Sequence, residues 1–272
     1  MADSGKKWLI GCGVGCGAVI LLGILLSVGG SLYLMGPFNK AVDAQKELVA
    51  QYGEREAYIP PPQGITQDRL EKFLAVRRAV MPMCAEFQKL GDSFAAMEEL
   101  DKGGDEPSKG EVFEALGNLT GGIFGMVGDM GRFHQLRNGA LLEGGMGLGE
   151  YVWIYVLAYN SWQGNSPNID IDGDSKGGMS RGEQKVMRTL VRNHAEALAS
   201  AGMTDEAALW EQEADRMKRS ETGVPFEIGG LPADLIQVFL PYEKELSELY
   251  CEATSSFEMN RVRKKGLSIH SD

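Results

Sequence analysis

A long apolar stretch lies near the N-terminus of the chain. No charged residue occurs between positions 8 and 35, and about 20 apolar residues are enough to cross the hydrocarbon core of a bilayer. Lys6 and Lys7 directly precede the stretch, and positively charged residues tend to remain on the cytoplasmic side of a membrane. The pattern predicts a transmembrane anchor at residues 8–35, a short cytoplasmic N-terminus at residues 1–7, and a following domain outside the cytoplasm.

Two properties of the anchor stay open. Signal peptides have apolar regions of about 7–15 residues, which is shorter than this one, but Ser27-Val28-Gly29 has the small residues of a cleavage site. Glycines four residues apart would let two anchors pack closely, or the anchor packs on nothing. The glycines of this pairing face are Gly11, Gly15, Gly13 and Gly17. The expected membrane partners are the lipid bilayer and, through that face, a second copy of the chain.

The segment after the anchor has the pattern of a stalk. Residues 41–52 read as helical, and Ile59 is followed by three prolines, which suit neither a helix interior nor a central strand. We therefore expect a helical stalk and a proline-rich spacer at residues 36–63, and a packed domain at residues 64–260.

Apolar positions in the packed domain recur at helical spacing, and the alternation typical of strands is nearly absent. A glycine, an apolar residue and then a capping residue or proline mark five helix starts, at Gly64, Gly145, Gly178, Gly202 and Gly230. The sequence predicts an all-α fold, with one N-terminal transmembrane helix followed by a multi-helix bundle. The expected helices cover approximately residues 67–100 with a kink at Pro82, 110–142, 148–163, 181–201, 205–219 and 232–260.

Two details of this pattern are specific enough to check. Ser180 and Glu183 have the spacing of a capping box, in which each residue satisfies a free N–H group of the other. Residues 151–162 are apolar on almost every side of a helix, which is typical of a helix buried at the centre of a domain.

Charge is distributed unevenly along the chain. The net charge is −11, of which residues 1–40 contribute +2 and residues 261–272 contribute +3, so the remainder carries −16. Such an acidic body argues against nucleic acid as a partner, because phosphate contacts need clustered lysines and arginines. The basic C-terminal tail at residues 261–272 would suit acidic lipid or an acidic partner, or is simply solvated.

An acidic stretch resembles the first half of an EF-hand or dockerin calcium loop. Oxygen-bearing side chains occupy its first, third and fifth positions, and glycine occupies the sixth. The twelfth position holds Met179 where a bidentate glutamate is expected, so Glu183 would have to substitute from a longer loop. The alternative is a solvated acidic turn. The candidate calcium ligands are Asn168, Asp170, Asp172, Asp174 and Glu183.

Two of the four cysteines fall in the predicted soluble domain, at Cys84 and Cys251. Outside the cytoplasm such a pair is a disulfide candidate, and two separate buried thiols are the alternative. The chain has three histidines, and those on predicted helices, His134 and His194, are expected at the surface or half-buried.

No motif for nucleophilic catalysis, zinc binding or nucleotide binding occurs in the sequence. We therefore predict a membrane-tethered helical interaction or scaffold domain that faces outside the cytoplasm and binds an unknown protein partner. We expect no cofactor, unless the acidic loop binds calcium. A calcium-binding or ligand-sensing domain and an enzyme with an unrecognised active site are the alternatives.

Overall fold

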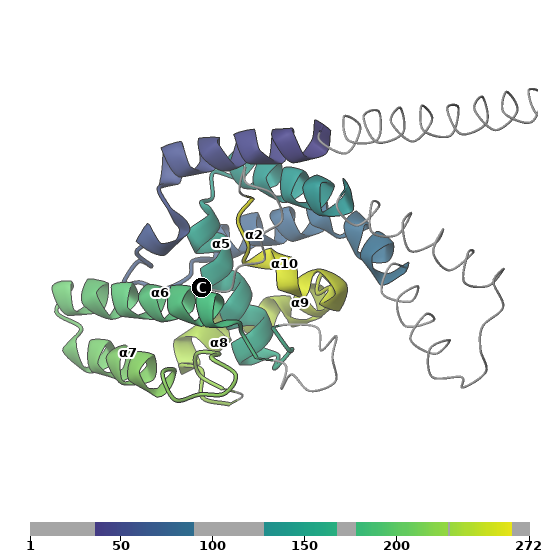
Figure 1. The fold of residues 1–272 in the computed structure, drawn as a ribbon. Coiled ribbons are helices and arrows are strands. Elements are labelled where there is room, and N and C mark those ends of the chain that lie inside the picture. The colour runs from purple at the N-terminus through teal and green to yellow at the C-terminus, as the bar shows by residue number, and fades with distance from the viewer. Residues whose placement is uncertain (1–35, 90–127, 168–177, 228, 263–272) are drawn as a thin grey trace, which may run out of the picture.

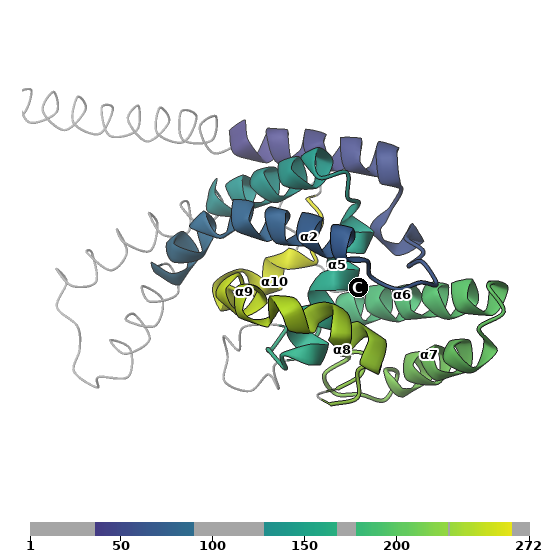
Figure 2. The same cartoon turned by 180° about the vertical axis from the view of Figure 1, so that it is seen from behind.

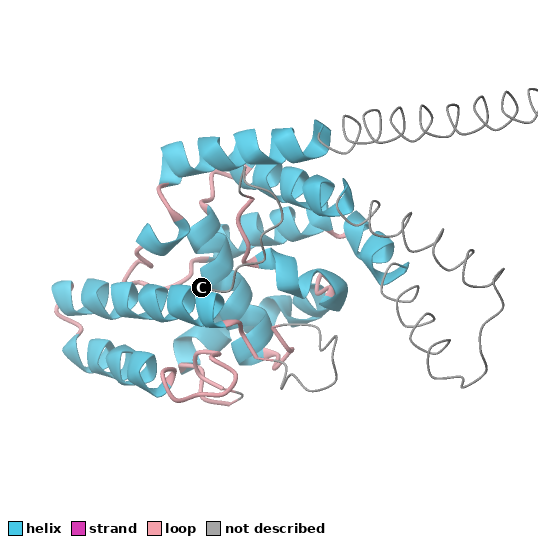
Figure 3. Cartoon of the chain, viewed as in Figure 1, coloured by secondary structure: helices cyan, strands magenta, loops and turns pink. Residues whose placement is uncertain are grey.

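The computed structural model describes residues 36–89, 128–167, 178–227 and 229–262. Every regular element in these ranges is a helix, and they contain no strand (Figure 3). The prediction of an all-α helical bundle is therefore confirmed for the described part of the chain.

The predicted anchor at residues 8–35, with its four pairing glycines, lies outside the described residues. Among the residues that are described, no helix combines the length and the apolar character that crossing a bilayer requires.

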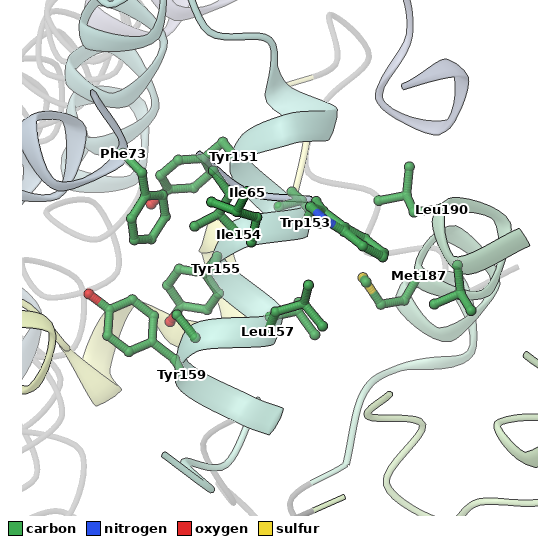
Figure 4. Packing of buried hydrophobic residues seen from close by; sticks show 14 of the residues in the cluster. Ile65, Phe73, Tyr151, Trp153, Ile154, Tyr155, Leu157, Tyr159, Met187 and Leu190 are labelled. Atoms are coloured by element: carbon green, nitrogen blue, oxygen red, sulfur yellow. The ribbon is translucent and has the colours of Figure 1, made fainter. Parts of the chain in front are cut away.

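A helix with aromatic side chains runs through the middle of the body (Figure 1). It starts as α5 (Leu148–Tyr155) and continues as the π-helix η2 (Val156–Trp162). Every side chain from Tyr151 to Ser161 is buried, which confirms the predicted central helix. Figure 4 shows Phe73 beside its tyrosines and Met187 beside Trp153 and Leu157 on the opposite side. The domain is thus built around one fully enclosed helix.

The helix expected at residues 67–100 breaks at a proline. α2 (Gln67–Val80) begins after Thr66, whose hydroxyl accepts from the backbone N–H of Arg69. It ends at Val80, and a second helix covers residues 82–89. Proline lacks the N–H group that would continue a helix but suits the first position of a new one, so the break falls at Pro82 as expected.

The helices α6 (Arg181–Ser200) and α7 (Thr204–Arg216) form an antiparallel hairpin (Figure 1). The capping box of Ser180 and Glu183 is present at the start of α6. In the pattern that starts at Gly202, the expected capping residue is the third one, Thr204. This expectation is wrong, because Met203 is the N-cap and Thr204 is already helical. The end of α6 explains this: Gly202 has φ +80° and the N–H of Met203 bonds back to the carbonyl of Leu198, which leaves no residue for a separate cap.

The single long helix expected at residues 232–260 is also wrong. The segment consists of several short helices, which are interrupted at Pro241 and by two irregular stretches. Figure 2 shows two of these helices, α8 and α9, from behind. Backbone carbonyls there accept from arginine side chains of distant helices, which competes with a continuous helix. The pieces are α8 (Ala233–Phe239), η3 (Leu240–Tyr242), α9 (Glu243–Glu248), η4 (Glu252–Thr254) and α10 (Ser255–Glu258).

The segment expected as a helical stalk and proline-rich spacer packs against the body. The helix at residues 36–52 lies along the helix at residues 128–143 in both views (Figures 1 and 2), and its Ala41 and Leu48 are buried. The spacer after it is held as well, because Asn193 of α6 donates to the carbonyl of Tyr58 at 2.8 Å. Residues between Ala41 and residue 63 are therefore part of the packed body, which begins earlier than residue 64.

A glycine of α5 is required by a close approach of the chain to itself. The 3-10 helix η1 (Arg55–Ala57) crosses α5 at Gly149, where an added Cβ atom would lie 2.5 Å from the Cβ of Tyr58 and would overlap the backbone oxygen of Arg55. We predict that Gly149→Ala destabilises the domain by about 2 kcal/mol or more, since overpacking costs about 1–3 kcal/mol and backbone cannot move aside as a side chain can. Urea unfolding of the full chain would measure this.

Gly182→Ala is the matched control, because Gly182 also lies in a helix and an added Cβ there meets nothing within 4 Å. It should leave stability unchanged or raise it by up to about 1 kcal/mol, as alanine favours helix over glycine. Equal effects of the two substitutions would show that the contact between η1 and α5 is not tight.

Candidate functional site

A buried ion pair joins α2 to the C-terminal segment. Arg77 and Glu258 are both 0% exposed and form a salt bridge. Tyr151 of α5 connects them, since its hydroxyl accepts from Arg77 Nη1 at 3.0 Å and donates to Glu258 Oε2 at 2.6 Å. Thr254 donates to the same carboxylate at 2.9 Å, and Arg77 also donates to the carbonyl of Leu249. We call Arg77, Tyr151 and Glu258 the buried triad.

Two tyrosine rings of the aromatic helix lie beside the guanidinium group of Arg77. The guanidinium carbon of Arg77 lies 5.3 Å from the ring centre of Tyr155 and 5.4 Å from that of Tyr159, within the range of a cation–π attraction. Burial lowers the pKa of Arg77, but the charge of Glu258 and the tyrosines outweigh this, so the pKa lies well above its ordinary value. Arg77 is therefore a permanent cation inside the core.

Two further arginines bind the backbone of the same C-terminal segment. Arg137, on the helix at residues 128–143, is fully buried and donates to the carbonyls of Phe257, Glu258 and Asn260. Arg55 donates to the carbonyl of Met259. Arginine at a helix C-terminus satisfies carbonyls that have no partner within the helix, so these side chains cap α10. Burial lowers the pKa of Arg137 to about 10, which still leaves it charged at neutral pH.

The triad combines acid, base and hydroxyl chemistry, but its position argues against catalysis. All three side chains are fully buried, so a substrate has no route to them in this conformation. Burial is the largest cause that raises the pKa of the Tyr151 hydroxyl well above its ordinary value. The tyrosine hydroxyl therefore stays protonated and bridges the ion pair. The arrangement is suited to fixing the C-terminal segment against α2 and α5.

Cys84 and Cys251 form a disulfide beside this network. They have Cα atoms 5.8 Å apart and are separated by 167 residues in sequence. The bond connects the helix at residues 82–89, which follows α2, to the C-terminal segment that the buried triad joins to α2.

The two described histidines are buried, so the expectation of surface or half-buried positions is wrong. The ring of His194 lies 4.5 Å from that of Trp210 and 5.4 Å from that of Trp153, and its Nδ1 faces the carbonyl of Pro60. Burial lowers the pKa of His194 and lowers that of His134 well below its ordinary value. Both side chains are neutral packing groups of the core.

The candidate calcium ligands Asn168, Asp170, Asp172 and Asp174 lie outside the described residues. Glu183 is described, and its carboxylate accepts from the backbone N–H of Ser180 at 2.9 Å in the capping box. Among the described residues, no group of three or more His, Cys, Asp or Glu side chains is arranged to hold a metal ion.

A surface pocket of about 410 Å³ lies where η2 ends against α9. Two hydrogen bonds connect its walls: Gln163 Nε2 donates to Ser247 Oγ at 3.0 Å, and the Tyr250 hydroxyl donates to the carbonyl of Ser166 at 3.1 Å. Its lining consists of Trp162, Gln163, Asn165, Glu243, Ser247 and Tyr250. Unlike the buried triad, this group of polar side chains is open to a ligand.

Sequence reasoning found the disulfide pair but missed the triad and the pocket. One signal for the triad was present, because Arg77 falls on the apolar face of its helix, among Phe73, Leu74 and Val80. A charge on such a face calls for a buried partner. Nothing in the sequence indicates that the partner is Glu258, 181 residues away.

Comparison of the chain with protein-family models, with curated proteins and with solved structures gave no match. The functional argument therefore rests on the geometry described above.

The triad predicts a large difference between neighbouring arginines. Arg77→Met leaves the buried Glu258 carboxylate without its cation, and removing one partner of a buried pair costs about 3–5 kcal/mol. Arg78→Met removes an ion pair with Glu245 in which the arginine is 55% exposed, and such pairs contribute less than about 1 kcal/mol. Urea unfolding of both full-length variants would measure the contrast. A loss below about 1 kcal/mol for Arg77→Met would contradict a role of the triad in stability.

Proposed function

We propose that the protein is a single-pass membrane protein whose helical domain lies outside the cytoplasm and acts there as a tethered interaction module. The Cys84–Cys251 disulfide carries this proposal. Disulfides persist in oxidising compartments and are rare in the cytosol. This agrees with the orientation expected from Lys6 and Lys7 before the apolar segment at residues 8–35.

The packing of the first described helix supports a close tether. The proposed span ends at residue 35, the chain is already helical at residue 36, and this helix has buried residues from Ala41 onward. With no free stalk between them, the anchor would hold the domain against the membrane surface. A fixed position at the membrane suits the recognition of a neighbouring protein in the same envelope.

The roles of the reactive side chains favour binding over catalysis. The buried triad, the arginines that cap α10 and the two buried histidines all hold the fold together. The body between residues 41 and 260 is strongly acidic, and such a field steers encounters with basic partners while repelling nucleic acid and acidic lipid.

Thiol labelling tests where the domain resides. In a full-length chain with Cys12→Ser and Cys16→Ser, Cys84 and Cys251 are the two remaining cysteines. After expression and rapid denaturation, maleimide-linked polyethylene glycol should add to neither thiol without reductant and to both after reduction, as seen on a gel. Two additions without reductant would place the domain in a reducing compartment and contradict the proposal.

Crosslinking in intact membranes tests the interaction role separately. The membrane-bound full chain should give discrete crosslinked complexes that are larger than the chain alone. The domain released from the membrane by protease should not give these complexes. A correctly oriented, oxidised domain that forms no such product would contradict the role as an interaction module while leaving the topology standing.

A further inference from the structure

The pocket between η2 and α9 is held in shape by the backbone of the π-helix. The N–H of Gln163 bonds to the carbonyl of Ala158 at 3.2 Å, and that of Asn165 bonds to the carbonyl of Tyr159 at 2.9 Å. π-helical turns occur often at functional sites. Here the wide turn ends the buried helix so that Trp162, Gln163 and Asn165 reach the surface together. With a volume of about 410 Å³, the pocket is large enough for a small molecule.

Four of the polar side chains in the pocket lining each donate one hydrogen bond within the protein. Gln163 donates to Ser247, Asn165 donates to Gln163 at 3.2 Å, and Ser247 donates to the carbonyl of Glu243. The Tyr250 hydroxyl donates to the carbonyl of Ser166. The lining contains no Lys, Arg or His that would balance the charge of an anion, and the carboxylate of Glu243 would repel one.

A carboxylate and two aromatic side chains in the pocket lining are available to contact a ligand. The carboxylate of Glu243 is exposed and, among the described residues, forms neither an ion pair nor a hydrogen bond. Trp162 and Tyr250 are half-buried in the same lining. A carboxylate together with aromatic rings is the combination that attracts an organic cation. A single carboxylate is a poor match for calcium, which takes about six to eight oxygen ligands.

We propose that this pocket binds a small organic cation that carries an ammonium group. Glu243 neutralises its charge, the rings of Trp162 and Tyr250 contact its carbon substituents, and the amide oxygen of Asn165 accepts from it. The site does not depend on the proposed membrane topology, so its test is read independently of the labelling and crosslinking experiments.

Calorimetric titration of the purified full chain in detergent tests the site, at about 0.15 M salt so that diffuse attraction to the acidic body is screened. The probes are tetramethylammonium chloride, n-butylammonium chloride, and tert-butanol as a neutral molecule of similar shape. At least one ammonium probe should bind saturably, and tert-butanol should bind at least about tenfold more weakly, because it lacks the charge that Glu243 and the rings attract.

Glu243→Gln should weaken ammonium binding by at least about tenfold while leaving the circular dichroism spectrum unchanged, since Glu243 is exposed. Glu248→Gln is the matched control: Glu248 is an exposed glutamate of the same helix α9, outside the pocket lining. It should bind as the unmodified chain does. Absence of saturable binding of both ammonium probes, equal affinity for tert-butanol, or equal weakening by the two glutamate substitutions would overturn the proposal.

Discussion

The ion pair between Arg77 and Glu258 is the constraint on which the rest of the domain depends. A charge in an apolar interior is costly unless it is paired and hydrogen-bonded, so the two side chains can be buried only together. To form the ion pair, α2, the aromatic helix and the C-terminal segment must meet at one point, where Tyr151 bridges Arg77 and Glu258. The disulfide from Cys84 to Cys251 then links the helix after α2 covalently to the same C-terminal segment.

This constraint also explains the broken C-terminal segment and the pocket. The carbonyls of Leu249 and of residues 257–260 accept from three arginines, so the chain there follows its partners on other helices. The turn that carries Leu249 also positions Tyr250, which closes one side of the pocket. An element that secures the fold therefore also shapes the surface at which we place a ligand.

The helical class, the central helix, the capping box and the break at Pro82 could be predicted from sequence, because each depends on residues within one or two turns of one another. The stalk and the C-terminal helix were mispredicted, because both are determined by distant partners. Local pattern cannot show that Ala41 packs under another helix or that Leu249 gives its carbonyl to Arg77. The pocket was missed for the same reason, since its two walls lie about 80 residues apart in the chain.

A double-mutant cycle between Arg77 and Glu258 tests the central claim most directly. The free energies of unfolding of Arg77→Met, Glu258→Gln and the double variant would be compared with that of the unmodified chain. If the pair is buried as a unit, each single substitution strands the opposite charge, and the double variant should be more stable than the sum of the two losses implies by about 2 kcal/mol or more. Losses that add to within about 0.5 kcal/mol would show that the two side chains act independently, and would contradict the account.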